Sequence, residues 1–193
     1  MKKQPTREKL LDVTFDEIYK HGYHATSVDA ILKKASVPKG SMYHHFKNKK
    51  ELVLAMVRER LFPKMDQFFR FEKVKGKSAL ESIRNTYAAM ARNKPLIKHG
   101  CPMYRLIVEM SEFDEDFNLL LKEKTELMQK NLAKLLEMGI EEETINSGID
   151  SKVHAIFMLN ATWGILSQSP SLSSPKSFSK QIQIITKNLE PTN

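Results

Sequence analysis

The sequence predicts an all-α fold, with a small three-helix head followed by a larger helical domain and about nine helices in all. Apolar residues recur at helical spacing along almost the whole chain of 193 residues. No alternation of period two is long enough to indicate a β-strand. The chain contains only 7 Gly and 8 Pro, so the loops between the helices must be short or few.

The first predicted helix begins at Thr6, whose side chain we expect to cap it, and stops at Gly22. Leu11, Phe15 and Ile18 follow the spacing i, i+4, i+7, which places them on one face. Glycine suits the left-handed conformation that commonly ends a helix.

The second and third predicted helices are short and are separated by a tight turn. The second opens at Thr26-Ser27, and its apolar residues, including Ile31 and Leu32, share one face. The turn ends at Pro38, which is favourable at a helix start because it donates no N–H there. The third helix, residues 39–46, is about two turns long.

Helical segments continue to the C-terminal end of the sequence. Asn48 and Glu51 have the spacing of a capping box and open a long helix that Pro63 is expected to kink or end. Further helices are predicted at residues 78–93, 95–110, 114–138, 150–167 and 177–189, with a loop at 73–77, breaks at Gly139 and at 146–148, and a Ser- and Pro-rich connection at 167–177.

Basic residues are concentrated in the N-terminal part. The chain carries 31 Lys and Arg and 23 Asp and Glu, a net charge of +8. Residues 1–50 hold 11 basic and 5 acidic residues (net +6), whereas residues 51–193 hold 20 and 18 (net +2). This asymmetry favours nucleic acid as a partner, then an anionic membrane, although charge alone leaves a solvated basic face equally open.

Cys101 is the single cysteine, so no intrachain disulfide can form and a reducing compartment fits the sequence. Residues 1–8 lack the apolar core of a signal peptide. The longest apolar-rich stretch, residues 153–166, is too short and too polar to span a bilayer. The sequence therefore predicts a cytoplasmic protein with no membrane partner.

Three short helices with a tight turn between the second and third have the geometry of helix-turn-helix DNA binders. In such a module two helices cross steeply, so that the second enters the major groove. The shared core is expected to contain Val28, Ile31, Leu32, Val37, Met42 and Phe46.

The opposite face of the third helix then carries Lys39, Gly40, Ser41, Tyr43, His44 and His45. Gly40 allows the backbone to approach a phosphate closely, and the hydroxyls of Thr26, Ser27 and Tyr43 can donate to phosphate oxygens. Neighbouring residues on a helix point about 100° apart, so His44 and His45 cannot chelate one ion together. We expect no metal and no cofactor.

Residues 26–31 (TSVDAI) and 35–52 (ASVPKGSMYHHFKNKKEL) carry a recognisable pattern. Over about residues 6–57 the chain resembles the TetR-type (TetR/AcrR) transcriptional regulators. Gly100-Cys101, followed by Leu106 and Glu109, is similar to a pattern in one branch of that family. Elsewhere the resemblance is one of helix layout.

The resemblance implies a DNA-binding domain at residues 1–50 and an effector-binding and dimerisation domain at residues 51–193. It implies a homodimeric repressor, in which each head reads half of a pseudo-palindromic double-stranded DNA operator and a small molecule releases the DNA. An activator of the same fold is the alternative. By motif position, the DNA contacts are expected from Thr26, Ser27, Lys39, Gly40, Ser41, Tyr43, His44, His45 and Lys49.

An apolar effector pocket is expected in the larger domain, because methionine side chains adapt to varied ligand shapes. Its expected lining is Met90, Cys101, Met103, Tyr104, Phe117, Met128 and Trp163, although each of these also fits an ordinary helical core. Cys101 is either a redox- or electrophile-sensing thiol, with Lys98, His99 and Arg105 near it in sequence, or an inert buried residue.

The last two predicted helices suit dimerisation, since one presents small residues and the other an apolar stripe. The expected interface consists of Phe157, Ala161, Gly164, Ile165, Ile182 and Ile185. Pairing across a two-fold axis would form the four-helix bundle that the resemblance implies.

Two other classes of function, an enzyme and a non-specific basic protein, predict different features. The sequence contains no His-Glu-x-x-His motif, phosphate-binding glycine loop or nucleophile elbow, so we expect no enzyme and no catalytic residues. A non-specific basic architectural or membrane-surface protein would bind unrelated DNA, or anionic vesicles, as well as it binds any chosen site.

Overall fold

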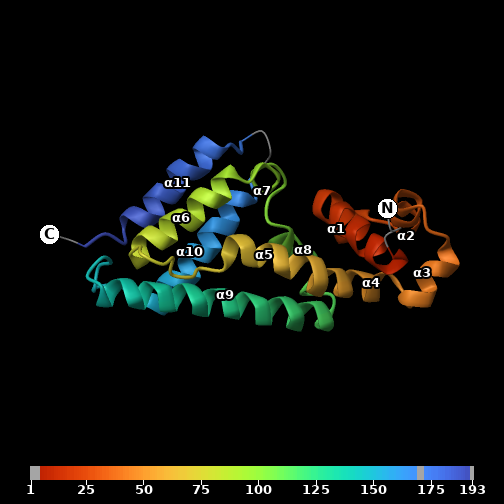
Figure 1. Ribbon diagram of the computed structural model, residues 1–193, viewed down its shortest axis with the longest axis horizontal. Helices are drawn as coiled ribbons and strands as arrows, with labels where there is room; N and C mark the ends of the chain where they lie inside the picture. The colour runs from red at the N-terminus through yellow and green to blue at the C-terminus, as the bar shows by residue number, and fades with distance from the viewer. Residues whose placement is uncertain (1–4, 169–171, 192–193) are drawn as a thin grey trace. The chain divides into compact units, whose positions relative to one another are not determined.

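The computed structural model describes residues 5–168 and 172–191 (Figure 1), so the first four residues and part of the predicted 167–177 connection lie outside the described residues. The regular structure of the described part is helical, which confirms the all-α prediction. No helix in this part is long and apolar enough to cross a membrane.

The chain divides into two compact units. The first contains the described residues up to Met65 together with Pro102–Leu121, and the second contains Asp66–Cys101 and the described residues from Lys122 onward. These units follow packing and not function, so the predicted functional boundary between residues 50 and 51 stays a prediction.

The first unit is arranged around α1, which contacts most of the other helices in it. Leu10, Leu11 and Ile18 of α1 are buried in its core. The elements of this unit are α1 (Thr6–Ala25), α2 (Val28–Ala35), α3 (Lys39–His45), α4 (Lys49–Met56), the π-helical segment η1 (Val57–Leu61), the start of α5 (Phe62–Phe69), α8 (Pro102–Met110) and the start of α9 (Glu115–Glu141).

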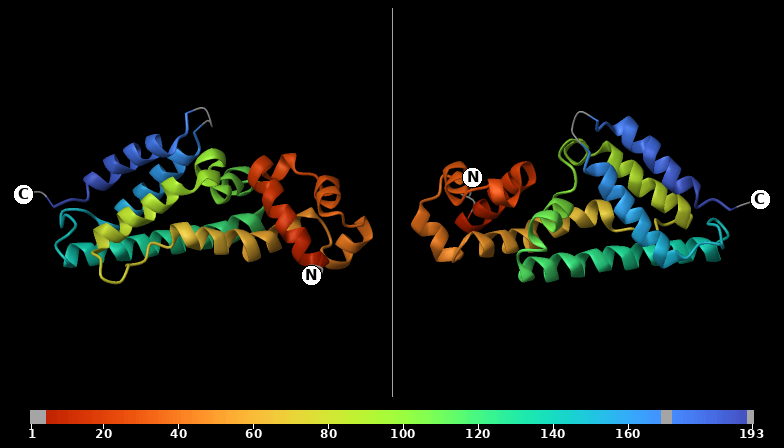
Figure 2. Two further views of the ribbon diagram at one scale, coloured as in Figure 1. Left: turned by 45° about the horizontal axis from the view of Figure 1, so that its top comes forward. Right: turned by 180° about the vertical axis from the view of Figure 1, so that it is seen from behind.

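The second unit contains three helices that lie side by side, α6 (Ala79–Arg92), α10 (Ser151–Leu166) and α11 (Pro175–Lys187) (Figures 1 and 2). The short helix α7 (Lys94–His99) contacts all three. The remaining residues of α5 and α9 complete the unit.

The predicted caps at two helix starts are confirmed only in part. The Asn48 side chain accepts the Glu51 N–H at 2.9 Å, but the Glu51 carboxylate accepts the N–H of Lys47 and not that of Asn48. The prediction that Thr6 caps α1 was wrong, because the cap position is Pro5 and Thr6 is already helical.

Pro63 does not end the helix that begins at Lys49. The chain passes through η1, where the N–H of Phe62 bonds to the carbonyl of Val57, and then continues as α5. A proline ring collides with the carbonyl four residues before it in a regular α-helix. The wider π turn directly before Pro63 fits the removal of this collision.

The predicted helix at 95–110 is two helices, separated at Gly100. Gly100 has φ 78°, and a Cβ at this position would lie 2.7 Å from the carbonyl oxygen of Leu166. Pro102, which lacks an N–H, then begins α8. Gly139 does not break α9; a Cβ there would overlap the side chain of Ile145, so glycine permits close packing at this point.

Candidate nucleic-acid interface

The turn between α2 and α3 fixes the path of the chain into the third helix. Ser36 adopts the left-handed conformation with φ 49°, and the Val37 N–H bonds to the Leu32 carbonyl at 3.1 Å. These are features of a Schellman-type helix end. Pro38 then caps α3.

The core that joins α2 and α3 is largely as predicted. Ile31, Leu32, Met42 and Phe46 are buried. Val28 and Val37 are half-buried, because they lie at the margins of this cluster. Met42 is the buried residue within α3 and fixes which side of this short helix faces outward.

The outward side of α3 carries the predicted residues. Lys39, Gly40, Tyr43, His44 and His45 are exposed and Ser41 is half-buried. No atom lies within 4 Å of the position that a Cβ on Gly40 would occupy, so the backbone there is open to a partner. The face therefore combines a cation, hydroxyls and imidazoles with an accessible stretch of backbone.

Ser27 and Thr26 are neighbours in the sequence but differ in exposure and in hydrogen bonding. Ser27 is exposed and caps α2 by accepting the Ala30 N–H at 3.1 Å, which leaves its hydroxyl proton free to donate. Thr26 is 2% exposed, and its hydroxyl donates to the Gly22 carbonyl at 2.7 Å. Its residue type suggested a phosphate contact, but its side chain belongs to the interior of this unit.

Lys49 is also bound internally. Its Nζ donates to the Tyr23 carbonyl at 2.5 Å and lies 4.1 Å from the centroid of the Tyr23 ring. Burial lowers the pKa of Lys49, opposed by the charge of Glu109. The motif position suggested a phosphate ligand, whereas the ammonium here binds the end of α1.

Three other basic side chains of the first unit form ion pairs with carboxylates. Lys34 lies 2.5 Å from Glu17, and Arg60 bonds to Asp12. Lys50 bonds to Asp114 and Asp116, and these hydrogen bonds raise the pKa of Lys50 to about 12.

Lys39 remains accessible on the outward face of α3. Its Nζ lies 3.6 Å from Asp29, and the two side chains are 60% and 80% exposed. A pair this exposed is weak and is readily exchanged for a phosphate.

The residues predicted to line an effector pocket are mostly buried. Met103, Tyr104 and Phe117 belong to the first unit, and Met90, Cys101, Met128 and Trp163 belong to the second. Tyr104 is half-buried and the others are core residues. Their role in effector binding stays a prediction.

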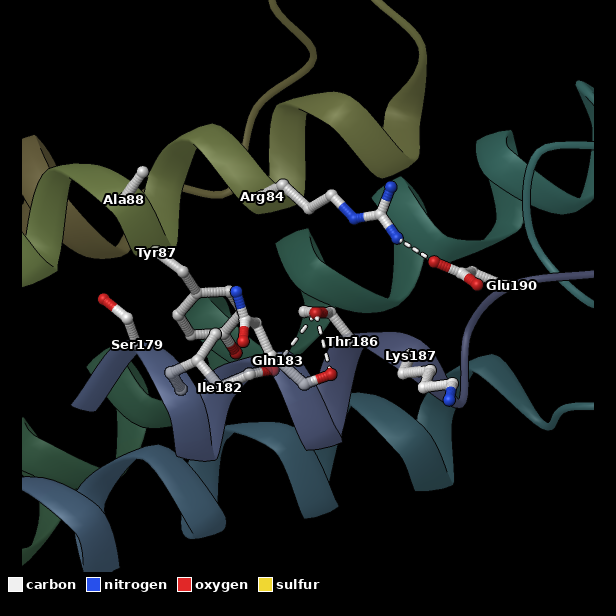
Figure 3. Close-up of a pocket in the computed structure, with 9 residues that line it drawn as sticks. All are labelled: Arg84, Tyr87, Ala88, Ser179, Ile182, Gln183, Thr186, Lys187 and Glu190. Carbon is white, nitrogen blue, oxygen red and sulfur yellow. Dashed lines mark hydrogen bonds and ion pairs between the residues drawn. The ribbon is translucent and has the colours of Figure 1, made fainter. Parts of the chain in front are cut away.

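A groove of about 570 Å³ runs between α6 and α11 in the second unit (Figure 3). Tyr87 and Ile182 lie between the two helices, and Arg84 pairs with Glu190 at one end. Burial raises the pKa of Tyr87 to about 12, opposed by the hydrogen bond from Thr162. This groove was not predicted from the sequence, because residues far apart along the chain, on α6, on α11 and just after α11, form it together: Arg84, Tyr87, Ala88, Ser179, Ile182, Gln183, Thr186, Lys187 and Glu190.

The predicted dimer residues separate into exposed and buried sets. On α10, Phe157 and Gly164 are exposed, and Ala161 and Ile165 are half-buried. On α11, however, Ile182 and Ile185 are 5% and 8% exposed, because α11 packs against α6 and α10 within the same chain. Ile184, which the prediction did not name, is 68% exposed.

Two family descriptions match the chain, in agreement with this geometry. Residues 10–56 match "Bacterial regulatory proteins, tetR family". Residues 76–185 match "Tetracyclin repressor-like, C-terminal domain".

Curated relatives and solved structures agree with these matches. The chain is 33% identical over 135 residues to an uncharacterized HTH-type transcriptional regulator of Lactococcus lactis, covering 68% of each chain. It is 32% identical over 132 residues to the transcriptional regulator AcuR of Cereibacter sphaeroides, covering 66% of this chain and 59% of AcuR. The crystal structure of regulatory protein TetR from Rhodobacter sphaeroides superposes with a TM-score of 0.81 and 24% identity, over 95% of this chain and 98% of that one.

Proposed function

Because the chain belongs to the tetR family of bacterial regulatory proteins and is a DNA-binding transcriptional regulator, we propose that it is a homodimeric repressor. Each α3 would read one half of a pseudo-palindromic operator, and a small molecule would release the DNA. The observation that carries this proposal is the outward face of α3, where exposed polar side chains surround the open backbone at Gly40.

We assign the DNA contacts to Ser27 at the start of α2 and to the outward face of α3. That face contributes Lys39, Gly40, Ser41, Tyr43, His44 and His45. Thr26 and Lys49 are left out of this set, because both side chains bond inside the unit. Ser27, Tyr43 and Lys39 would contact phosphates, and the remaining residues of α3 would approach base edges.

Dimerisation is assigned to α10 and the exposed side of α11. Phe157 and Gly164 lie seven residues apart on one exposed face of α10, together with Ala161, and Ile184 is exposed on α11. The small residues would let two helices approach closely, and Phe157 would supply apolar surface to bury between them. Two copies related by a two-fold axis would then form a four-helix bundle.

The effector is assigned to the second unit, which holds most of the residues that match the description "Tetracyclin repressor-like, C-terminal domain". Cys101 is 4% exposed, which favours a core thiol over a freely accessible sensing thiol. We also propose that the protein acts in the cytoplasm, where it would meet its DNA partner, and we assign no catalytic step to it.

Selection of bound sites from a random DNA pool, followed by competition with unrelated DNA, tests the proposal. We expect an enriched pseudo-palindrome that binds at least about a thousandfold more tightly than unrelated DNA. Sedimentation of the complex should show two chains on one site. Equal affinity for all sequences would contradict specific reading and would favour an architectural protein. Expression from a reporter carrying the enriched site then separates a repressor from an activator.

A further inference from the structure

Helix α8 reaches the end of α1 through two charged side chains. The Arg105 guanidinium donates to the carbonyls of Tyr19 at 3.3 Å and Lys20 at 3.1 Å. The last carbonyls of a helix lack intrahelical partners, so this contact satisfies two of them. One carboxylate oxygen of Glu109 accepts the N–H groups of Tyr23 at 2.5 Å and His24 at 3.4 Å. A single helix thus binds the backbone on both sides of Gly22.

Gly22 lies directly beside this contact and has an unusual backbone conformation. Its φ of 82° lies in the left-handed region, where residues with a Cβ are strained. A Cβ at this position would also overlap the Glu109 carboxylate. The positive φ favours glycine here, and the absence of a Cβ also leaves room for the Glu109 carboxylate in its present position.

The corner formed by residues 22–26 begins at the non-helical Gly22 within α1 and leads to α2, and other side chains also bind it. Lys49 donates to the Tyr23 carbonyl, and the Tyr23 ring meets the Phe117 ring edge-on at 5.5 Å between centroids. Thr26 closes the corner through its bond to Gly22. Since Ser27 caps α2 directly after this corner, the direction in which α2 leaves α1 depends on these contacts.

We propose that Glu109 and Arg105 are positioning residues for DNA recognition. From α8 they fix the 22–26 corner, which sets α2 and, through the shared core, α3 in the orientation that reads the operator. This role, which rests on the proposed function, extends the recognition apparatus beyond the helix-turn-helix segment to residues 102–110. Base contacts depend on placement to a fraction of an ångström, whereas attraction to phosphates depends mainly on charge. The orientation should therefore affect operator binding far more than binding to unrelated DNA.

The Glu109→Ala variant of the whole chain tests whether the Glu109 carboxylate positions the DNA-binding helices. At a temperature where circular dichroism shows the variant to be folded, we expect operator affinity to fall about tenfold. Affinity for unrelated DNA should change less than about twofold. Glu112→Ala is the matched control, because Glu112 is an exposed carboxylate close to Glu109 in the sequence, and it removes the same charge. Glu109→Gln should recover part of the affinity, since its amide oxygen can still accept the Tyr23 N–H.

A second pair of variants examines the corner without DNA. Gly22→Ala should cost less stability in the Glu109→Ala background than in the wild type, because the overlap with the carboxylate is gone while the positive φ remains. The amide resonances of Tyr23 and His24 should shift in Glu109→Ala and not in Glu112→Ala.

The outcomes separate this role from the proposed function. Absence of sequence preference in the wild type would contradict the proposed function. With a specific wild type, unchanged operator affinity in Glu109→Ala would overturn the positioning role, and so would an equal loss on operator and unrelated DNA. If Glu109→Ala does not fold, the Glu109→Gln variant tests the positioning role in its place. Its operator affinity must then fall relative to Glu112→Gln while its affinity for unrelated DNA does not.

Discussion

Lys39 and Lys49 lie at opposite ends of the segment that carries the recognition helix, and their surroundings differ. The Lys39 side chain is 60% exposed and makes one loose pair with Asp29. Lys49 is half-buried, with its ammonium on the Tyr23 carbonyl and over the Tyr23 ring. Two lysines of one motif thus divide between a face that meets solvent and a corner that fixes the backbone.

Other basic side chains of the first unit are also bonded within the fold, as Lys49 is. Lys34, Lys50 and Arg60 are paired with carboxylates of other helices. Within residues 1–50, Arg7 pairs with Glu59, and Lys50 pairs with Asp114 and Asp116, so carboxylates outside this segment compensate part of its net charge. We expect the number of phosphates contacted by each head to be smaller than the charge of +6 over residues 1–50 suggests.

The largest expected effect is on stability, and it should differ between the buried and the outward side of α3. Met42→Ala should lower the free energy of unfolding by about 2–5 kcal/mol, because it empties a fully buried site in the core shared by α2 and α3. Chemical denaturation measures this loss. Tyr43→Ala, one residue further along, serves as the control and should change stability by less than about 0.5 kcal/mol, because its ring is half exposed.

Tyr43→Ala should instead weaken operator binding by about 1–3 kcal/mol, because it removes a side chain from the reading face. Fluorescence anisotropy with a labelled operator gives the affinity. Tyr43→Phe keeps the ring and removes the hydroxyl, so a loss equal to that of Tyr43→Ala would assign the effect to phosphate bonding. An unchanged affinity in both variants would contradict the placement of Tyr43 at the DNA.

The two lysines should differ in the salt dependence of operator binding. Lys39→Ala should reduce the slope of log affinity against log salt by about 1, since one phosphate contact is lost. Lys49→Ala should leave that slope unchanged. It should instead lower the free energy of unfolding by about 1 kcal/mol, because it removes a hydrogen bond to the Tyr23 carbonyl. Equal slope changes would show that Lys49 also reaches phosphate.

The smallest effect concerns pH and the pair between Arg7 and Glu59. The hydrogen bond from Arg7 lowers the pKa of Glu59 below its ordinary value of 4.5, opposed by partial burial. A carboxylate with a lowered folded-state pKa contributes stability above its unfolded pKa and loses it as the pH falls through the folded value. Arg7→Gln should therefore destabilise the protein slightly near neutral pH and not at pH 2. Acid titration of the unfolding free energy compares the variant with wild type, and an equal difference at both pH values would exclude linkage through Glu59.

Capping residues and hydrophobic spacing predicted most of the helices. The cap at Ser27, the cap at Asn48 and the core residues Ile31 and Met42 follow from residue type and spacing within a few positions. The break at Gly100 and the π turn before Pro63 were missed or misplaced, because each depends on backbone geometry beyond the hydrophobic period.

The outward face of α3 was also largely predictable, because Met42 is buried and leaves the other side of this short helix exposed. Thr26 and Lys49 lie outside α3, and their side chains bond within the unit although their chemistry suits phosphate equally well. Only their neighbours in space, Gly22 and Tyr23, decide that they bond inward.

From its residues and their order, the sequence by itself determined an all-α chain, a helix-turn-helix segment and the outward residues of α3. Periodicity and capping act over a few residues, which is why a linear pattern reveals them. Only the tertiary structure decided that α8 joins the first unit and that Glu109 occupies the space beside Gly22. It also decided that Ile184, and not Ile182 or Ile185, is exposed on α11. These features depend on which helices meet, and that is set by contacts between residues distant in the sequence.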